Sequence, residues 1–292
     1  MTQPVWLEVA LNGPFGPKRQ PHAPYTASAL IEEGLACARA GAAIIHLHVY
    51  DEATGIQNDA LDTYVRVIEA IREKEDVIVY PTVPMGGGGD PGSPERAKAR
   101  YAVIDELGRR GLLEWSVVDP GSCNLARFED VAAGGQGVLY PNTVADIDEG
   151  LRLAREHRIH PSYAVYEPGF LRLGAALAKR HGCPAPIYRF MFSDEFTFGY
   201  PPAGYAVESY VKLLEAEAPG APWMVAGLGV DIFPIAQVAM ELGGHLRVGQ
   251  EDTPFGWEVS NVTQTERMAA IVARAGRSLA TAQDIRAALT ER

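Results

Sequence analysis

The segment AGAAIIHLHVYDEATG, residues 40–55, contains in miniature the pattern that decides the fold. Gly41 is predicted to end a preceding helix, because glycine readily takes the left-handed conformation that closes helices. The apolar run 43–49 then predicts a buried strand, and an acidic turn ends it. A helix, a short connection and a buried strand form the repeating unit of a parallel α/β sheet.

The same rhythm continues along the whole chain. Short apolar runs that predict strands alternate with longer amphipathic stretches, at residues 6–11, 43–49, 77–82, 113–118, 162–166, 187–192, 223–227 and 245–249. Helical periodicity or capping predicts helices over the intervening segments, chiefly 26–40, 61–74, 145–157, 205–217 and 232–242. The tail TAQDIRAAL opens with Thr281 and Asp284 spaced as a capping box, which predicts a C-terminal helix.

One further apolar run, 137–140, does not fit the repeat. The segment between it and the preceding strand has no convincing helix, and parallel strands need a crossover of about a dozen residues. We interpret this run as an excursion, that is, a segment that is not one of the barrel strands. Eight strands remain, which favours an α/β fold of the (β/α)8 TIM barrel type, with an open doubly wound sheet as the rival. We expect residues 1–292 to form a single barrel domain with the C-terminal helix packed on it.

The composition limits the classes of function. The net charge of −11 argues against a nucleic-acid partner, which usually meets a basic surface. The three cysteines, Cys37, Cys123 and Cys183, form no CxxC pair, which suits a reducing cytoplasm. No signal peptide is evident and no apolar run is long enough to cross a membrane. We therefore expect a cytoplasmic enzyme or binding protein without a membrane or nucleic-acid partner.

His46 and His48 lie two residues apart at the end of a predicted strand. Alternation points both side chains to one face, ~6–7 Å apart, where they could share a divalent metal or simply pack in the barrel. A third ligand would decide between these readings. RVGQED, residues 247–252, ends the last strand with Arg247, Glu251 and Asp252, and Gly249 permits the break that would let both acids face a site. The alternative is a surface turn with a structural ion pair.

Two other strand ends carry candidate substrate contacts. YPTVPMGGGG, residues 80–89, offers the hydroxyl of Thr82 and the backbone of Gly86 and Gly87, which could line an anion site or form a surface loop. It lacks the Lys-Ser/Thr ending of a P-loop. Ser122, in DPGSCN, could contact a substrate or bond the backbone, and no GxSxG elbow surrounds it.

Several motifs, taken in order, resemble those of the β-keto acid cleavage enzymes, whose type member is the 3-keto-5-aminohexanoate cleavage enzyme. They span nearly the whole chain and comprise ALNG, PYT, AGAAIIHLHVYDEATG, GSCN, NT, WMVAGLG and GGHLRVGQED. The pairing of HLHV with RVGxED is specific. The resemblance implies a metal-dependent (β/α)8 barrel, usually with Zn²⁺, that forms a homo-oligomer, a dimer or tetramer. It also implies a retro-Claisen acyl transfer, from a β-keto acid and acetyl-CoA to acetoacetate and an acyl-CoA.

The resemblance assigns roles to individual residues. His46, His48 and Glu251 match the family's metal ligands. Asp252 and Arg247 match the acid and arginine that act together, so that Asp252 would move a proton while Arg247 tunes it and holds a carboxylate. The hydroxyl residues around the substrate match Thr82 and Ser122.

Three departures bear on the substrate. Phe15 stands about where the family carries an acidic residue, Tyr50 replaces an arginine, and residues 81–89 replace a serine and a shorter glycine-rich turn. These positions line the family's substrate pocket, so we expect a neutral or anionic β-keto acid rather than 3-keto-5-aminohexanoate. Two alternatives remain at this point. One is a metal-dependent aldolase, hydrolase or isomerase acting on a small oxo acid without CoA, and the other is a non-catalytic, metabolite-binding barrel.

Overall fold

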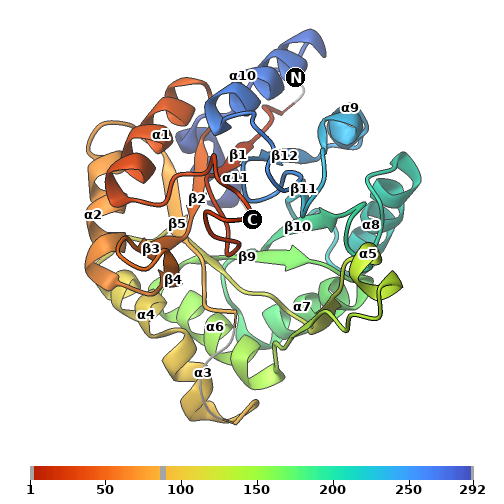
Figure 1. Ribbon diagram of the computed structural model, residues 1–292. Helices are drawn as coiled ribbons and strands as arrows, with labels where there is room; N and C mark the ends of the chain where they lie inside the picture. The colour runs from red at the N-terminus through yellow and green to blue at the C-terminus, as the bar shows by residue number, and fades with distance from the viewer. Residues whose placement is uncertain (1–2, 86–89, 291–292) are drawn as a thin grey trace.

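The computed structural model describes residues 3–85 and 90–290, and it confirms the predicted (β/α)8 barrel (Figure 1). Eight parallel strands follow one another in the order β5-β2-β1-β12-β11-β10-β9-β6. The two end strands, β5 and β6, lie side by side, which brings the sheet into a nearly closed barrel. The strands are β1 (Leu7–Ala10), β2 (Ile44–Leu47), β5 (Ile78–Pro81), β6 (Trp115–Val117), β9 (His160–Val165), β10 (Ile187–Phe192), β11 (Trp223–Gly227) and β12 (His245–Val248).

Helices surround these strands on the outside (Figure 1). The longer ones bury an apolar face, as α2 does with Tyr64, Val67, Ile68 and Ile71. The helices on the outside are α1 (Ala27–Arg39), α2 (Leu61–Arg72), α3 (Pro94–Arg100), α4 (Ala102–Arg109), α6 (Val144–His157), α7 (Pro168–His181), α8 (Gly204–Glu217), the 3-10 turn η1 (Phe233–Ile235) with α9 (Ala236–Glu241), and α10 (Asn261–Arg274), and the last helix of the chain is α11 (Ala282–Thr290). The sequence analysis set no boundaries for α3, α4, α7 and α10.

The last helix, α11, packs near the amino-terminal ends of β5 and β6. Its first turn has the predicted capping box, in which Thr281 and Asp284 exchange hydrogen bonds. Ile285 is fully buried, and Arg286 pairs with Asp76 and Glu114, which precede β5 and β6. The helix therefore covers the end of the barrel at which the strands begin.

The excursion at 137–140 lies outside the barrel sheet, as predicted. β8 (Val138–Tyr140) pairs antiparallel with β7 (Cys123–Leu125) in a separate two-stranded sheet, and the short helix α5 (Phe128–Ala132) lies between them. Neither strand belongs to the barrel. The unit follows β6 and therefore stands on the carboxyl side of the strands, where loops build the site.

The predicted strand 43–49 is shorter than expected. β2 ends at Leu47, and the chain turns into a hairpin of β3 (Val49–Asp51) and β4 (Ile56–Asn58). The side chain of Asn12 takes the place of a neighbouring strand at His48: its Oδ1 accepts the His48 N–H at 2.8 Å, and its Nδ2 donates to the His48 carbonyl at 2.9 Å. Asn12 therefore satisfies both backbone groups of His48 at the point where β2 ends.

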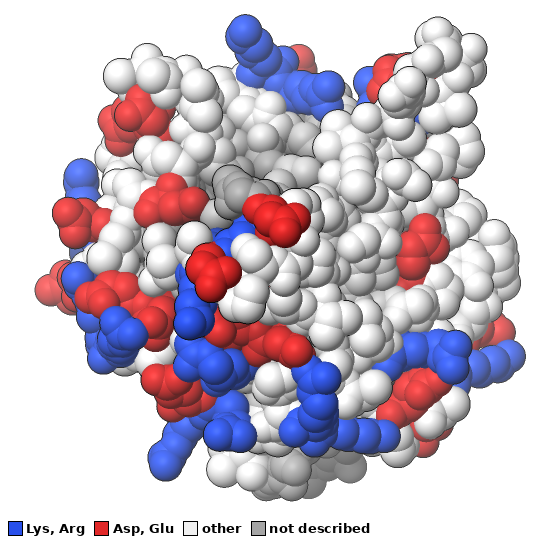
Figure 2. Space-filling model, turned by 90° about the horizontal axis from the view of Figure 1, so that it is seen from below, with Lys and Arg blue, Asp and Glu red and all other residues white. Residues whose placement is uncertain are grey.

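The surface and the interior of the barrel differ in their charges. On the face seen in Figure 2, basic and acidic side chains are intermingled, in keeping with ion pairs such as Asp105–Arg109 and Glu149–Arg152. The interior is filled at its amino-terminal half by aromatic residues, including Trp6 stacked on His245 with ring centroids 4.1 Å apart. No helix in the described part of the chain combines the length and apolar composition of a membrane-spanning segment.

Candidate active site

His46 and His48 lie at the carboxyl end of β2, and both are buried, with 2% and 3% of their surface exposed. His46 pairs with Ala10 of β1 and Tyr80 of β5 in the barrel, so its backbone is fixed on both sides. The two imidazole rings meet edge to face with centroids 5.2 Å apart. The side chains therefore share one face, as alternation predicts, although His48 itself stands just outside the strand.

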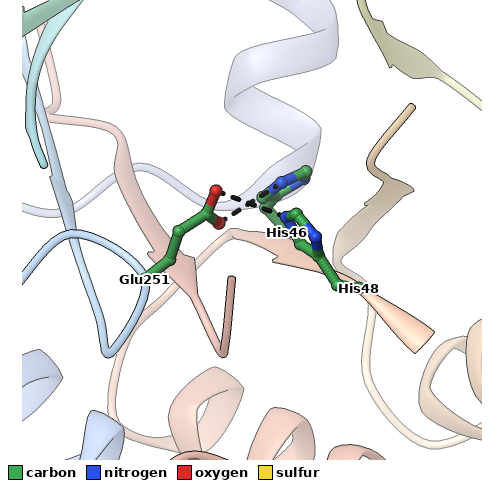
Figure 3. Close-up of side chains that lie close together, drawn as sticks. All are labelled: His46, His48 and Glu251. Atoms are coloured by element: carbon green, nitrogen blue, oxygen red, sulfur yellow. Dashed lines mark hydrogen bonds and ion pairs between the residues drawn. The ribbon is translucent and has the colours of Figure 1, made fainter. Parts of the chain in front are cut away.

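Glu251 reaches both histidines from the far end of the chain (Figure 3). Its Oε2 lies 3.4 Å from His46 Nε2 and its Oε1 lies 3.3 Å from His48 Nε2. One ligand atom from each residue lies within 4.8 Å of the others, so the three form a possible metal site. Glu251 is therefore placed where a third ligand beside the two histidines would have to lie.

Gly249 brings Glu251 to this position. Its φ of +136° is a conformation that side chains rarely adopt, and a Cβ atom there would lie 2.1 Å from the carbonyl oxygen of Ala10. The chain passes so close to β1 here that there is no room for a side chain, and the positive φ bends it away at the end of β12. Both features require glycine. The predicted break at Gly249 is present, and it directs Glu251 toward the histidines and Asp252 toward Arg247.

Replacing Gly249 with alanine is expected to lower the free energy of unfolding by about 3 kcal/mol or more, because φ strain and a backbone clash add together. Thermal unfolding measures this loss. Gly243→Ala is the matched control, since Gly243 also has positive φ (+85°) but nothing lies within 4 Å of an added Cβ. Equal destabilisation by the two substitutions would contradict the close-approach argument.

Electrostatics prepares two of the three candidate ligands, His46 and Glu251, for a cation. Burial, together with the positive charges of Arg247 and Arg189, holds the pKa of His46 well below its usual value, although Glu251 opposes this shift. His46 is therefore neutral, the form that coordinates metals. Burial raises the pKa of Glu251, but Arg247 and the two histidines outweigh it and lower the pKa below the ordinary range, so the carboxylate is ionised.

A second contact orients His48. Its Nδ1 lies 3.0 Å from Oε1 of Gln57, on the hairpin strand β4. Because an amide oxygen accepts a hydrogen bond, this contact places the imidazole proton on Nδ1 and leaves Nε2 with a free lone pair toward Glu251. The hairpin after β2 thus has a function in the site that the single predicted strand did not reveal.

Arg247 forms the centre of a buried network beside the candidate ligands. Its guanidinium holds Asp252 with Nε and Nη2, the latter 2.7 Å from Oδ1, and its Nη1 lies 3.0 Å from Glu8 Oε1. Nη2 also lies 3.1 Å from Glu251 Oε2, and Tyr80 donates to Glu8 at 2.6 Å. A single cation is therefore shared by three carboxylates, which fixes the position of the guanidinium.

The candidate ligands open onto a cavity at the carboxyl end of the barrel. Arg247 and Thr82 line it, as do several residues that the sequence analysis did not single out, namely Pro14, Val83, Met85, Val117, Asp119, Leu125, Tyr140, Ala164, Tyr166, Arg189, Met191, Gly227 and Leu228. Phe15 also lines it, so the position where the family resemblance expects an acid contributes an aromatic ring. The wall is therefore largely apolar.

The sequence contains an indication that Arg189 is a functional residue. It is the one charged residue within the apolar strand IYRFMF, residues 187–192, and it is 3% exposed. A charge in the middle of a buried strand of a barrel points either to the outer helices or into the interior. Arg189 and Met191 point inward and line the cavity.

Other predicted site residues lie apart from the cavity. Asp252 is not among its lining residues and lies behind Arg247, so its role as proton acceptor stays a prediction. Ser122 is bonded to the backbone of Asn142, accepting from its N–H at 2.8 Å and donating to its carbonyl at 3.0 Å. Tyr50 donates to the carbonyl of Gly13 and accepts from Gly16 N–H, which ties the loop after β1 to the hairpin.

Neither Ser122 nor Tyr50 lines the cavity. Their predicted contacts with a substrate therefore have no direct support from the described residues. Gly86 and Gly87 lie outside the described residues.

Comparison with known proteins places the chain in a family. A model of the beta-keto acid cleavage enzyme family matches residues 4–290. The 3-keto-5-aminohexanoate cleavage enzyme of Fusobacterium nucleatum subsp. nucleatum is 27% identical over 278 residues, which cover 94% of this chain and 92% of that protein. The 3-oxoadipate:acetyl-CoA acetyltransferase of Cupriavidus necator is also 27% identical, over 294 residues that cover 99% and 95% of the two chains.

Solved structures agree on the fold. The binary complex of ObcA with oxaloacetate has a TM-score of 0.72 to this chain at 19% identity, covering 92% of this chain and 67% of that one. The resemblance drawn from the sequence motifs is confirmed by the family match. Because that match runs from just before β1 to the last residue of α11, the chain belongs to the beta-keto acid cleavage enzyme family.

Proposed function

We propose that this enzyme converts a β-keto acid and acetyl-CoA into acetoacetate and an acyl-CoA, with a divalent cation held by His46, His48 and Glu251. The observation that carries the proposal is the convergence of two imidazole nitrogens and a carboxylate within 4.8 Å at the catalytic end of the barrel. The names of relatives support the reaction. One is the acetyltransferase of Cupriavidus necator, and another, 24% identical, is the 3-dehydrocarnitine:acetyl-CoA trimethylamine transferase of Rhizobium meliloti.

The candidate ligands fit a divalent cation, and we propose zinc. Catalytic zinc sites commonly use three nitrogen or oxygen ligands and keep one position open. The Nε2 atom of each histidine faces one oxygen of the Glu251 carboxylate, at 3.4 Å for His46 and 3.3 Å for His48, so the three side chains direct their donor atoms toward one another. Glu251 Oε2 is buried and accepts no hydrogen bond from the described residues. A cation bound here would polarise the keto oxygen of a substrate as a Lewis acid.

Asp252 is the proposed proton acceptor. Burial raises its pKa although Arg247 lowers it, so the carboxylate is a stronger base than an ordinary aspartate. Arg247 stands between this carboxylate and the cavity, and a guanidinium stays protonated and cannot relay a proton. Asp252 must therefore face the substrate directly when it accepts a proton, which requires its contact with Arg247 to open on one side.

The cavity wall favours a neutral, apolar acyl group on the substrate. Phe15 packs edge to face against Phe255 with ring centroids 4.7 Å apart, and both contact a buried apolar cluster that includes Met191 and Leu228. Asp119 also lines the cavity, but its carboxylate already accepts hydrogen bonds from Tyr140 Oη and from the N–H of Ala164. An apolar wall stabilises a substrate whose methylene groups are buried against it.

Turnover with labelled acetyl-CoA and a panel of β-keto acids tests the proposed function. The panel should vary the acyl group from apolar to anionic and amine-bearing, with equal metal loading throughout. We expect labelled acetoacetate from apolar members. If no member of the panel yields labelled acetoacetate, the acyl-transfer proposal is wrong. Cleavage without CoA is then the next hypothesis to test.

Phe15→Glu is expected to shift specificity toward amine-bearing β-keto acids. A carboxylate at this wall would pair with an ammonium group and disfavour apolar acyl groups, changing the ratio of kcat/KM values by about tenfold or more. Steady-state kinetics with one apolar and one amine-bearing substrate measures this ratio. Phe128→Glu is the control, because Phe128 is 58% exposed and does not line the cavity. An unchanged ratio in Phe15→Glu would show that Phe15 does not contact the acyl group.

Zinc as the bound metal, a cytoplasmic location and a homo-oligomeric assembly stay predictions. Zinc is favoured here by the mixed nitrogen and oxygen donor set of His46, His48 and Glu251. Elemental analysis of the purified enzyme identifies the bound metal, and light scattering coupled to size exclusion measures the number of subunits.

A further inference from the structure

Two guanidinium groups line the cavity, and their surroundings differ. Arg247 is already neutralised by Glu8, Glu251 and Asp252, all within 3.1 Å. Arg189 has no carboxylate within ion-pair distance among the described residues, and its hydrogen bond to the carbonyl of Ser162 is long, at 3.4 Å.

The guanidinium of Arg189 is therefore incompletely satisfied. Its Nε is buried and has no hydrogen-bond partner in the described part of the chain. Only 3% of the residue is exposed to solvent. A buried charge without a close counter-ion is costly, and an anionic ligand in the adjoining cavity removes that cost.

The position of Arg189 relative to the candidate metal ligands follows from the strand order. β10 and β2 are separated by three strands in the order β2-β1-β12-β11-β10, so they stand opposite each other in an eight-stranded barrel. Arg189 projects into the cavity from β10, and His46 projects into it from β2. A small molecule held between these walls meets the candidate metal ligands on one side and the guanidinium on the other.

We infer that Arg189 binds the carboxylate of the β-keto acid, and that it sets the specificity for acids over their neutral analogues. The inference rests on the proposed function. In that reaction C2 of the β-keto acid bonds to the acetyl carbon, whose bond to the CoA sulfur breaks. The bond between C2 and C3 then breaks, and the acyl carbon C3 bonds to the CoA sulfur. The carboxylate on C1 is retained in acetoacetate. Substrate and product therefore share the group that Arg189 recognises, and a planar guanidinium suits a carboxylate geometrically.

This assignment revises the role that the family resemblance gave to Arg247. Its Nε, Nη1 and Nη2 all contact carboxylates of the chain itself. Arg247 therefore has little capacity left for a substrate carboxylate and serves to hold Glu251 and Asp252 in place. Arg247 therefore holds acidic side chains of the chain itself, whereas Arg189 binds the carboxylate of the ligand.

The test compares two probes that differ in one charge. Acetoacetate carries the carboxylate, and methyl acetoacetate keeps the keto group without it. Isothermal titration of the metal-loaded wild type is expected to show at least about tenfold tighter binding of acetoacetate, the effect of one charge-assisted contact. Arg189→Met should lose this preference and Arg189→Lys should retain part of it, with metal content unchanged. Tyr188→Phe is the control for disturbing β10, since Tyr188 does not line the cavity.

Steady-state kinetics provides a second test, because a purely structural role of Arg189 would not change KM for the β-keto acid selectively. Arg189→Met is expected to raise KM for the β-keto acid about tenfold or more while the KM for acetyl-CoA is unchanged. Binding of acetoacetate by Arg189→Met at wild-type strength, or a wild type that does not distinguish the two probes, would overturn the inference. So would a selective loss of CoA binding, which would assign Arg189 to the CoA phosphates.

The outcomes separate the two proposals. A wild type that binds acetoacetate through Arg189 but turns over no β-keto acid with acetyl-CoA would refute the proposed reaction and support the carboxylate site. Turnover that is unaffected by Arg189→Met, at unchanged KM, would support the reaction and refute the carboxylate site.

Discussion

The double substitution His46→Ala, His48→Ala is expected to remove a stoichiometric divalent cation from the enzyme and to lower turnover by at least about 10³-fold. Glu251 alone would remain of the three candidate ligands, beside Arg247, whose charge repels a cation. Elemental analysis after dialysis should give one ion per chain in the wild type and close to none in the variant.

Two controls make this result interpretable. His22→Ala removes an exposed histidine away from the cavity and should keep both metal and activity. Wild type stripped by a chelator should match the double variant in activity and regain it when metal is restored, whereas the variant should not. One ion per chain in the double variant would contradict the ligand assignment directly.

The barrel was predictable because its strands are short, apolar and regularly spaced by amphipathic segments. The predicted end of one strand was wrong at the point where the candidate site lies. Residues 43–49 are continuously apolar apart from the histidines, so hydrophobic pattern alone does not show that β2 stops at Leu47. The stop depends on Asn12, whose side chain bonds the backbone of His48 across 36 residues. Such a contact requires the fold before it can be seen.

The candidate site, too, was predictable only in part. Strand alternation predicts that His46 and His48 share a face, and Gly249 marks the turn that brings Glu251 to them. Proposing Glu251 rather than Asp252 as the third ligand needed the family resemblance as well. Arg189 was missed because its relation to His46 arises only when the barrel closes and sets β10 opposite β2. Its place after a predicted strand and the family resemblance suggested a substrate contact for Ser122, and the family resemblance alone suggested one for Tyr50. Both hydroxyl groups instead bond the backbone of neighbouring loops.

Asp252→Asn is expected to lower kcat by about 10²- to 10⁴-fold, the usual range for loss of a general base, while the metal content stays at the wild-type value. An amide keeps the shape of the carboxylate but cannot accept a proton in the reaction. Metal should be retained because Asp252 contacts Arg247 and the N–H of Gly227 rather than the candidate ligands. Asp231→Asn, at a loop aspartate outside the cavity lining, is the matched control and should have wild-type activity.

Exchange of the C2 protons of acetoacetate in D2O, followed by NMR without CoA, isolates the step assigned to Asp252. If Asp252 is the base, the asparagine variant loses the enzyme-dependent exchange together with turnover, because both begin with removal of a proton from C2. If Asp252 only positions Arg247, exchange persists near the wild-type rate while acyl transfer slows, and Arg247→Lys shows the same pattern. Full activity in Asp252→Asn would exclude both roles, because a neutral amide can neither accept the proton nor pair with the guanidinium as an anion.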